Sequence, residues 1–233
     1  RGGDEVKTEN TLEAFKYSSD LGFVYIETDV QATKDGKVVI FHDSNLKRLA
    51  GINKKVHELT LEEIRSIDLL EGGKIPLLSE ALELFPELRF NIDIKTEDAL
   101  DETIKIIKNM TALNRTCLAS FSSSRLERIR KIAGPESCTS SGQMEIFKMM
   151  CKSVGLPAEN TPGHCAQVPV SQWGVPVITK RFIKTAKNLN KLVHVWTIDD
   201  QETMNDLIDL GVDGLMTDKP SILKKALIAR GLF

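Results

Sequence analysis

The chain of 233 residues is 41% hydrophobic and 27% charged, which is enough apolar sequence to bury the core of one large domain. Its net charge of −2, from 31 Lys and Arg against 33 Asp and Glu, excludes a general attraction for nucleic acid or for an anionic membrane, so any anion needs a local site. No apolar run approaches the roughly 18 residues of a membrane-spanning helix. We therefore expect no stable membrane insertion and, as the default, a cytoplasmic location.

Short apolar runs alternate with amphipathic segments along the chain. The predicted strands are Val24–Val30, Phe90–Ile94, Thr116–Phe121, Ser137–Ser141, Gln167–Ser171, Leu192–Ile198 and Gly214–Thr217. The predicted helices are Thr11–Leu21, Ser79–Leu84, Ala99–Met110, Ser124–Ala133, Met144–Val154, Thr179–Leu189, Gln201–Leu210 and Ser221–Ala229. Such alternation is typical of βα units that build a parallel sheet, and we predict an α/β fold, a single (β/α)₈ TIM barrel over residues 1–233.

A barrel of this kind needs an eighth strand, and the remaining place for it is the N-terminus. Residues Arg1–Gly3 would be the end of that strand, so most of the first strand is expected to be missing. Asn10, followed three residues later by Glu13, predicts the N-cap of the first helix. Residues 44–75 exceed what a barrel connection requires, and we predict that they form an inserted segment that serves as a lid.

Two carboxylates interrupt the first apolar strand. Glu27 and Asp29 are two residues apart, so both side chains point to the same face of the strand. Like charges on one buried face repel each other and lose solvation, and they need a cation or another partner there. Lysines at the rim of the sheet are the simpler partner, whereas a divalent cation such as Mg²⁺ or Ca²⁺ is the partner that would indicate catalysis.

A hairpin follows this strand, because Asp35-Gly36 is a strong two-residue turn signal. With that turn, Lys34 pairs with Lys37, and the register places Asp29 opposite His42. An imidazole beside a metal ligand suits acid/base chemistry on a bound phosphate, since histidine titrates near neutrality.

A second charged strand end follows at Asp93 and Lys95, which share one face of the strand Phe90–Ile94. If this strand neighbours Val24–Val30, Asp93 can complete the metal site and Lys95 can reach a phosphate oxygen. Catalytic groups of barrel enzymes lie at the carboxyl ends of strands, as all of these do.

An ordered set of motifs resembles glycerophosphodiester phosphodiesterases, a family of phospholipase C-like phosphodiesterase barrels. The matching motifs are Arg1-Gly2-Gly3, Glu9-Asn10-Thr11, Ile26-Glu27-Thr28-Asp29-Val30, Thr33-Lys34-Asp35-Gly36, His42-Asp43, Asp93-Ile94-Lys95 and Trp196-Thr197. They span nearly the whole chain, and their order and spacing make the resemblance specific.

The resemblance implies a role for each of these positions. Glu27, Asp29 and Asp93 would bind one divalent cation, Mg²⁺ or Ca²⁺. His42 would act as the acid/base group, while Arg1 and Lys95 would contact the phosphate and belong to the catalytic set. Trp196 would pack against the glycerol or the head group of the substrate.

Two positions depart from the family pattern. Family members usually carry a histidine directly before the arginine matched by Arg1, and the given chain begins after that position. The position of Asp93 is commonly glutamate, so the carboxylate here is one methylene shorter.

The implied activity is metal-dependent hydrolysis of a small glycerophosphodiester to glycerol 3-phosphate and an alcohol, with histidine as acid and base. One alternative is a lysophospholipase D-like enzyme, which an exposed apolar groove in Leu59–Ile75 would favour. The other is a catalytically silent barrel that binds phosphodiesters or a protein partner. The released alcohol and the oligomeric state stay open.

Overall fold

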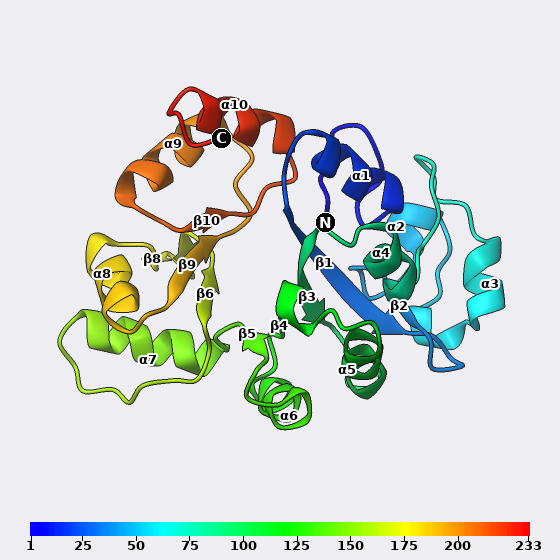
Figure 1. Cartoon of the computed structure of the whole chain (residues 1–233), viewed down its shortest axis with the longest axis horizontal. Coiled ribbons are helices and arrows are strands. Elements are labelled where there is room, and N and C mark those ends of the chain that lie inside the picture. The colour runs from blue at the N-terminus through cyan, green and yellow to red at the C-terminus, as the bar shows by residue number, and fades with distance from the viewer. The chain divides into compact units, whose positions relative to one another are not determined.

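The computed structural model describes residues 1–233, which fold into two compact units, Arg1–Cys138 and Thr139–Phe233. Figure 1 shows the alternation of strands and helices along the chain. No helix is both long and apolar enough to cross a membrane. The four cysteines are free thiols.

The first unit contains one sheet and the helices that follow its strands. Its elements are α1 (Leu12–Asp20), β1 (Tyr25–Ala32), β2 (Val38–Ile40), α2 (Lys47–Ala50), η1 (Val56–Glu58), α3 (Leu61–Ser66), α4 (Leu78–Leu84), β3 (Arg89–Ile94), α5 (Leu100–Asn109), η2 (Leu113–Arg115), β4 (Thr116–Ala119), α6 (Ser123–Ala133) and β5 (Cys138–Thr139). The strand order is β2-β1-β3-β4-β5. β1, β3 and β4 are parallel, and β2 is antiparallel to β1.

The second unit repeats the pattern with three parallel strands in the order β10-β9-β6. Its elements are α7 (Gln143–Ser153), β6 (Cys165–Val168), β7 (Ser171–Gln172), β8 (Val175–Pro176), α8 (Lys180–Asn188), β9 (Leu192–Val195), α9 (Gln201–Leu210), β10 (Gly214–Leu215) and α10 (Pro220–Ile228). β7 and β8 form a separate antiparallel hairpin.

All seven strands predicted from the apolar runs correspond to strands of these two sheets. Several predicted bounds are wrong: β4, β5, β9 and β10 are shorter than predicted, and β6 runs from Cys165 to Val168, so that Ser171 already belongs to the hairpin. Residues Arg1–Gly3 are not in a strand; the backbone carbonyl of Arg1 instead accepts a hydrogen bond from the Asn10 amide at 2.8 Å.

The two faces of β1 and β3 have different chemistry. Ile26 and Val30 of β1 and Ile92 of β3 are buried in the main core of this unit, where they pack with helices α1, α4, α5 and α6. Because side chains alternate along a strand, Asp29 and Asp93 lie on the opposite face. The core therefore anchors both strands while their other face carries the charges.

The hairpin after β1 does not have the predicted register. Val30 pairs with Ile40, and the Phe41 amide, not His42, donates to the carbonyl of Asp29 at 3.0 Å. The loop has three residues because the Thr33 amide bonds to Lys37, with Gly36 in the left-handed region at φ 72°. A three-residue loop with a left-handed glycine shifts the register by one position. The prediction that Asp29 faces His42 is therefore wrong.

The segment 44–75 has a small core of its own. Leu46, Val56 and Ile64 are fully buried and pack with Val39 and Phe41. Its helix α3 ends at Ser66. Leu59 and Ile75 are buried, whereas Leu70 between them is 68% exposed.

Helix α4 offers a matched test of the core. Leu82 is 1% exposed and lies in the main core, whereas Leu84 in the same helix is 58% exposed. Leu82→Ala should lower the free energy of unfolding by about 2–5 kcal/mol through lost burial and a residual cavity. Leu84→Ala should change it by less than about 0.5 kcal/mol. Chemical denaturation of both variants checks this, and equal effects would contradict the assigned helix face.

Candidate active site

Two buried carboxylates meet across neighbouring strands. β1 and β3 are parallel with Asp29 directly beside Asp93, and the two residues are 1% and 5% exposed. The Lys95 ammonium lies between them, at 2.8 Å from Asp29 Oδ1 and 2.7 Å from Asp93 Oδ2. In the absence of another cation, Lys95 balances two carboxylates at once.

The electrostatics of this group follow from burial and from Lys95. Burial alone would raise the pKa of Asp29, but Lys95 and a hydrogen bond from Asn10 outweigh it and hold that pKa below its usual value. Burial raises the pKa of Asp93, because Lys95 opposes it only in part. The pKa of Lys95 is raised since the two carboxylates outweigh its desolvation. The Lys95 ammonium therefore contacts both carboxylates, but the pKa is lowered for Asp29 and raised for Asp93.

Asp93 has an oxygen that nothing in the protein satisfies. Its Oδ1 atom is buried and has no hydrogen-bond partner, although Oδ2 is bonded to Lys95. An unsatisfied buried carboxylate oxygen is unfavourable and calls for a missing partner. Carboxylate oxygens are the ligands that Mg²⁺ and Ca²⁺ prefer, and Glu27 and Asp29 lie on the same face of β1.

Arg1 joins the N-terminal segment to these acids. Its backbone nitrogen lies 2.9 Å from Glu27 Oε2, and its guanidinium Nε lies 3.4 Å from Asp29 Oδ2. The Nη1 atom donates to Glu9 Oε1 at 3.2 Å. Burial raises the pKa of Glu27, and the Asp29 carboxylate on the same strand face adds to this shift. The structure therefore brings together Arg1, Glu27, Asp29, Asp93 and Lys95.

Asn10 is a contact that sequence patterns did not predict. Its side chain donates to Asp29 Oδ2 at 3.0 Å and accepts from the Thr28 hydroxyl at 2.8 Å. Asn10 is not the N-cap of α1, because Thr11 accepts the hydrogen bond from the Ala14 amide. The residue has a left-handed backbone at φ 58°, a conformation that asparagine adopts more readily than most residues. It therefore orients Asp29.

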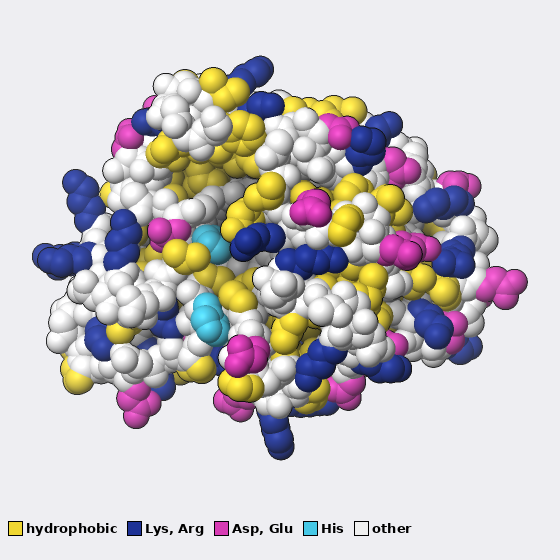
Figure 2. All heavy atoms as spheres, in the orientation of Figure 1, with side chains coloured by type: hydrophobic (Ala, Val, Ile, Leu, Met, Phe, Trp, Pro, Cys, Tyr) yellow, Lys and Arg dark blue, Asp and Glu magenta, His cyan; other side chains and the backbone are white.

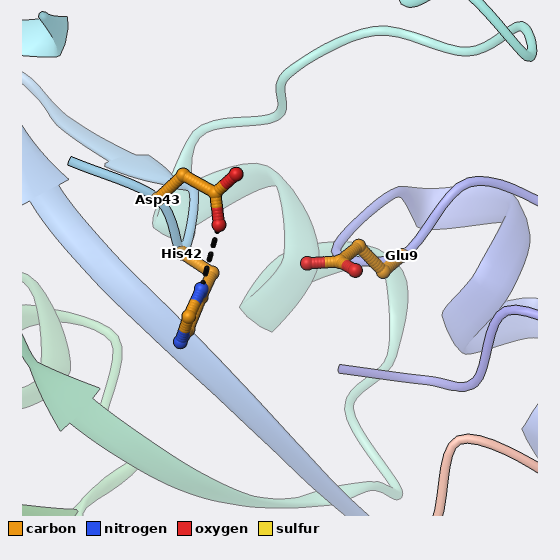
Figure 3. Close-up of side chains that lie close together, drawn as sticks. All are labelled: Glu9, His42 and Asp43. Atoms are coloured by element: carbon orange, nitrogen blue, oxygen red, sulfur yellow. Dashed lines mark hydrogen bonds and ion pairs between the residues drawn. The ribbon is translucent and has the colours of Figure 1, made fainter. Parts of the chain in front are cut away.

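His42 belongs to a second group, beside the first. Its Nδ1 atom lies 2.8 Å from Asp43 Oδ1, and Figure 3 shows the Glu9 carboxylate pointing toward this pair from the segment before α1. Ligand atoms of Glu9, His42 and Asp43 lie within 4.8 Å of one another, close enough to hold a metal ion.

A guanidinium already binds both acids of this second group. Arg48 of α2 donates to Glu9 at 2.9 and 2.8 Å and to Asp43 at 2.7 and 2.9 Å. The hydrogen bonds from Arg48, ahead of that from His42, lower the pKa of Asp43 to about 2. A metal ion here would have to replace four charge-assisted hydrogen bonds. The acids beside Lys95, in contrast, are buried, and one oxygen of Asp93 has no hydrogen-bond partner.

Trp196 lies in the second unit, directly after β9, and is half-buried. Its backbone amide donates to the carbonyl of Val168 at 3.2 Å, at the end of β6. Both positions lie at the carboxyl ends of their strands, where the predicted role of Trp196 requires it.

Comparisons with known proteins identify the family of the chain. The model of the glycerophosphoryl diester phosphodiesterase family matches residues 1–222. A Mycobacterium tuberculosis protein named "probable glycerophosphodiester phosphodiesterase 2" is 36% identical over 95% of this chain and 86% of its own length. A lysophospholipase D of Rattus norvegicus is 27% identical over 97% of this chain and 84% of its own length.

The fold is also shared with solved structures. A phosphodiesterase of Oleispira antarctica, solved in complex with the product sn-glycerol-3-phosphate, superposes with a TM-score of 0.81. It is 21% identical, and the match covers 98% of this chain and 94% of that chain. The likeness confirms the predicted (β/α)₈ fold class. With a family model that matches residues 1–222 and a relative at 36% identity, the chain belongs to the glycerophosphoryl diester phosphodiesterase family.

Proposed function

We propose that this protein hydrolyses glycerophosphodiesters to glycerol 3-phosphate and an alcohol, with one divalent cation held by Glu27, Asp29 and Asp93. One observation carries the proposal: Asp93 Oδ1 is buried and has no hydrogen-bond partner. The neighbouring Asp29 provides a second carboxylate, and both acids have Lys95 as their counter-charge. Membership of the family and the glycerol phosphate bound by the Oleispira antarctica enzyme support the same chemistry.

The cation, Mg²⁺ or Ca²⁺, would supply a Lewis acid that neutralises charge on the phosphate. Lys95 bridges Asp29 and Asp93, so a cation bound to these acids would replace it as their counter-charge. Lys95 then becomes available to a phosphate oxygen. Arg1, which contacts Glu9 and Asp29, supplies a second cationic contact to the same phosphate.

His42 is held so that one ring nitrogen is available for proton transfer. Asp43 is ionised at neutral pH and accepts from Nδ1, which leaves Nε2 to exchange a proton with the substrate. The side chain is about one third exposed, so it can reach a bound molecule. In the reaction implied by the family resemblance, a glycerol hydroxyl gives its proton to a second acid/base group, the histidine that family members carry directly before the position of Arg1, as it attacks phosphorus. His42 protonates the departing alcohol, and water then opens the cyclic diester.

A lysophospholipase D-like activity is the second candidate. The rat relative with that name matches 97% of this chain. An apolar substrate could meet two exposed apolar side chains, Leu70 in the segment Leu59–Ile75 and the tryptophan of the β7–β8 hairpin. The third alternative, a silent barrel, predicts that phosphodiesters bind without turnover.

The first prediction concerns the metal. The natural full-length protein should release glycerol 3-phosphate from glycerophosphocholine with Mg²⁺ or Ca²⁺ and should lose this activity in EDTA. Asp93→Asn should lower the metal-dependent rate by about 10²-fold or more, because it removes a charged ligand. Asp93→Glu keeps the carboxylate and is the matched control that should retain activity.

Thermal melts establish whether each variant is folded. Asp93→Asn at the wild-type rate would contradict the metal assignment. Binding of the diester without turnover, with any cation, would favour the silent barrel. Turnover of lysophosphatidylcholine alone would favour the lysolipid enzyme.

The second prediction concerns Arg48, which we assign as a positioning residue for His42 because it clamps Asp43. Arg48→Gln should lower kcat about 10–100-fold, the usual effect of losing such a supporting contact, while KM changes little. Arg65 of α3 forms an exposed ion pair with Glu80 and provides a control in the same segment. Arg65→Gln should leave both constants unchanged. A rise in KM alone for Arg48→Gln would mean that Arg48 binds substrate instead.

The third prediction concerns pH. Asp43 has a pKa of about 2 in the folded protein, against about 3.9 in an unfolded chain. A lowered pKa stabilises the fold above the unfolded value, and that contribution disappears as pH falls toward 2. The stability difference between wild type and Asp43→Asn should therefore be constant above about pH 5 and shrink below about pH 4. Urea denaturation across this range measures it, and a difference that does not change with pH would refute the assigned ion pair.

A further inference from the structure

The hairpin after β6 carries an unusual exposed side chain. β7 and β8 are joined by Trp173 and Gly174, both with positive φ, at 49° and 78°. This turn geometry favours glycine and asparagine, so the backbone conformation does not explain a tryptophan at this position. Trp173 is 93% exposed. A large amphipathic ring in full contact with water is typical of a docking surface.

The hairpin is firmly attached to the second unit. The amides of Val177 and Ile178 donate to the carbonyl of Val170 at 3.0 and 3.2 Å, and both side chains are buried. Beyond this base, Val170 and Val175 are 39% and 55% exposed on either side of Trp173. The base therefore fixes a protruding apolar tip in place.

The surroundings of the hairpin are basic, although the whole chain is slightly acidic. Between residues 143 and 191 the sequence has seven Lys and Arg but only two Glu. Lys180 and Arg181 begin α8 directly after the hairpin, and Lys184 follows one turn later. All three are exposed and form no ion pair in the structure. Figure 2 shows Lys and Arg side chains over the region of α8.

We propose that the β7–β8 hairpin and the first turn of α8 dock on an anionic lipid surface. Trp173 would enter the boundary between head groups and acyl chains, where tryptophan is favoured, while Lys180 and Arg181 face lipid phosphates. A lipid surface suits a single protruding ring, because it deforms around the ring and needs no complementary pocket. The unpaired cations supply the matching charge. Docking would bring the enzyme to a membrane that holds a lipid-embedded substrate, a consequence that rests on the proposed function.

Vesicle binding tests the proposal without any turnover. We would sediment the full chain with vesicles of phosphatidylcholine alone and of phosphatidylcholine mixed with phosphatidylserine, and follow tryptophan emission. Wild type should bind the mixed vesicles more tightly, with a blue shift, and Trp173→Ala should lose about tenfold or more in affinity and lose the shift. Lys180→Glu combined with Arg181→Glu should remove the preference for phosphatidylserine. Tyr25→Ala is the control, since Tyr25 is an exposed aromatic residue, 69% accessible, beside Arg89 at the start of β1.

Equal binding by wild type and Trp173→Ala, or no binding to either vesicle, overturns the proposal. A dimer in lipid-free solution that Trp173→Ala dissociates also overturns it and assigns the tip to a second copy of the chain. Turnover assays separate this inference from the proposed function. Trp173→Ala should lower turnover of lysophosphatidylcholine in mixed vesicles and leave that of soluble glycerophosphocholine unchanged. Loss of activity on both would contradict the docking role, whereas vesicle binding by an inactive wild type would contradict only the proposed function.

Discussion

The shared counter-charge of Asp29 and Asp93 is the constraint on which the site depends. Two carboxylates in register on parallel strands cannot both remain buried and ionised without a cation, and Lys95 is the one that the chain supplies. Two neighbours also stabilise the acids: Asn10 donates a hydrogen bond to Asp29, and Arg1 lies against Asp29 and Glu27. The balance is incomplete, because one oxygen of Asp93 has no partner. A site that is nearly neutral without metal can bind a divalent cation and release Lys95 to the substrate.

The strands and the carboxylate pair were predictable from local patterns. Buried strands of a parallel sheet appear as apolar runs, and a charge in such a run is conspicuous, which is why Glu27, Asp29 and Asp93 could be identified as one group. Their partnership with Lys95 follows from the alternation of side chains once the two strands are neighbours. The (β/α)₈ fold class followed from the alternation of strands with helices.

The second group of the site was less predictable, since it depends on loops. A single added residue in the hairpin turn moved the register, so His42 is not opposite Asp29. Arg48 lies in a four-residue helix with no sequence signal that connects it to Asp43, and only the packing of residues 44–75 brings the two together. Asn10 resembled a helix cap, but a neighbouring threonine takes that role. Side chains that act through tertiary contacts leave little local pattern to detect.

The central claim is that the cation binds at Glu27, Asp29 and Asp93, not at Glu9, His42 and Asp43. Crystals soaked in Mn²⁺ and measured at the manganese absorption edge would locate the ion directly. The account predicts an anomalous peak among the oxygens of the first group, including Asp93 Oδ1, with Lys95 displaced from at least one acid and Arg48 still bound to Asp43. A peak between His42 and Glu9 with Arg48 expelled, or no peak at either group, would contradict it.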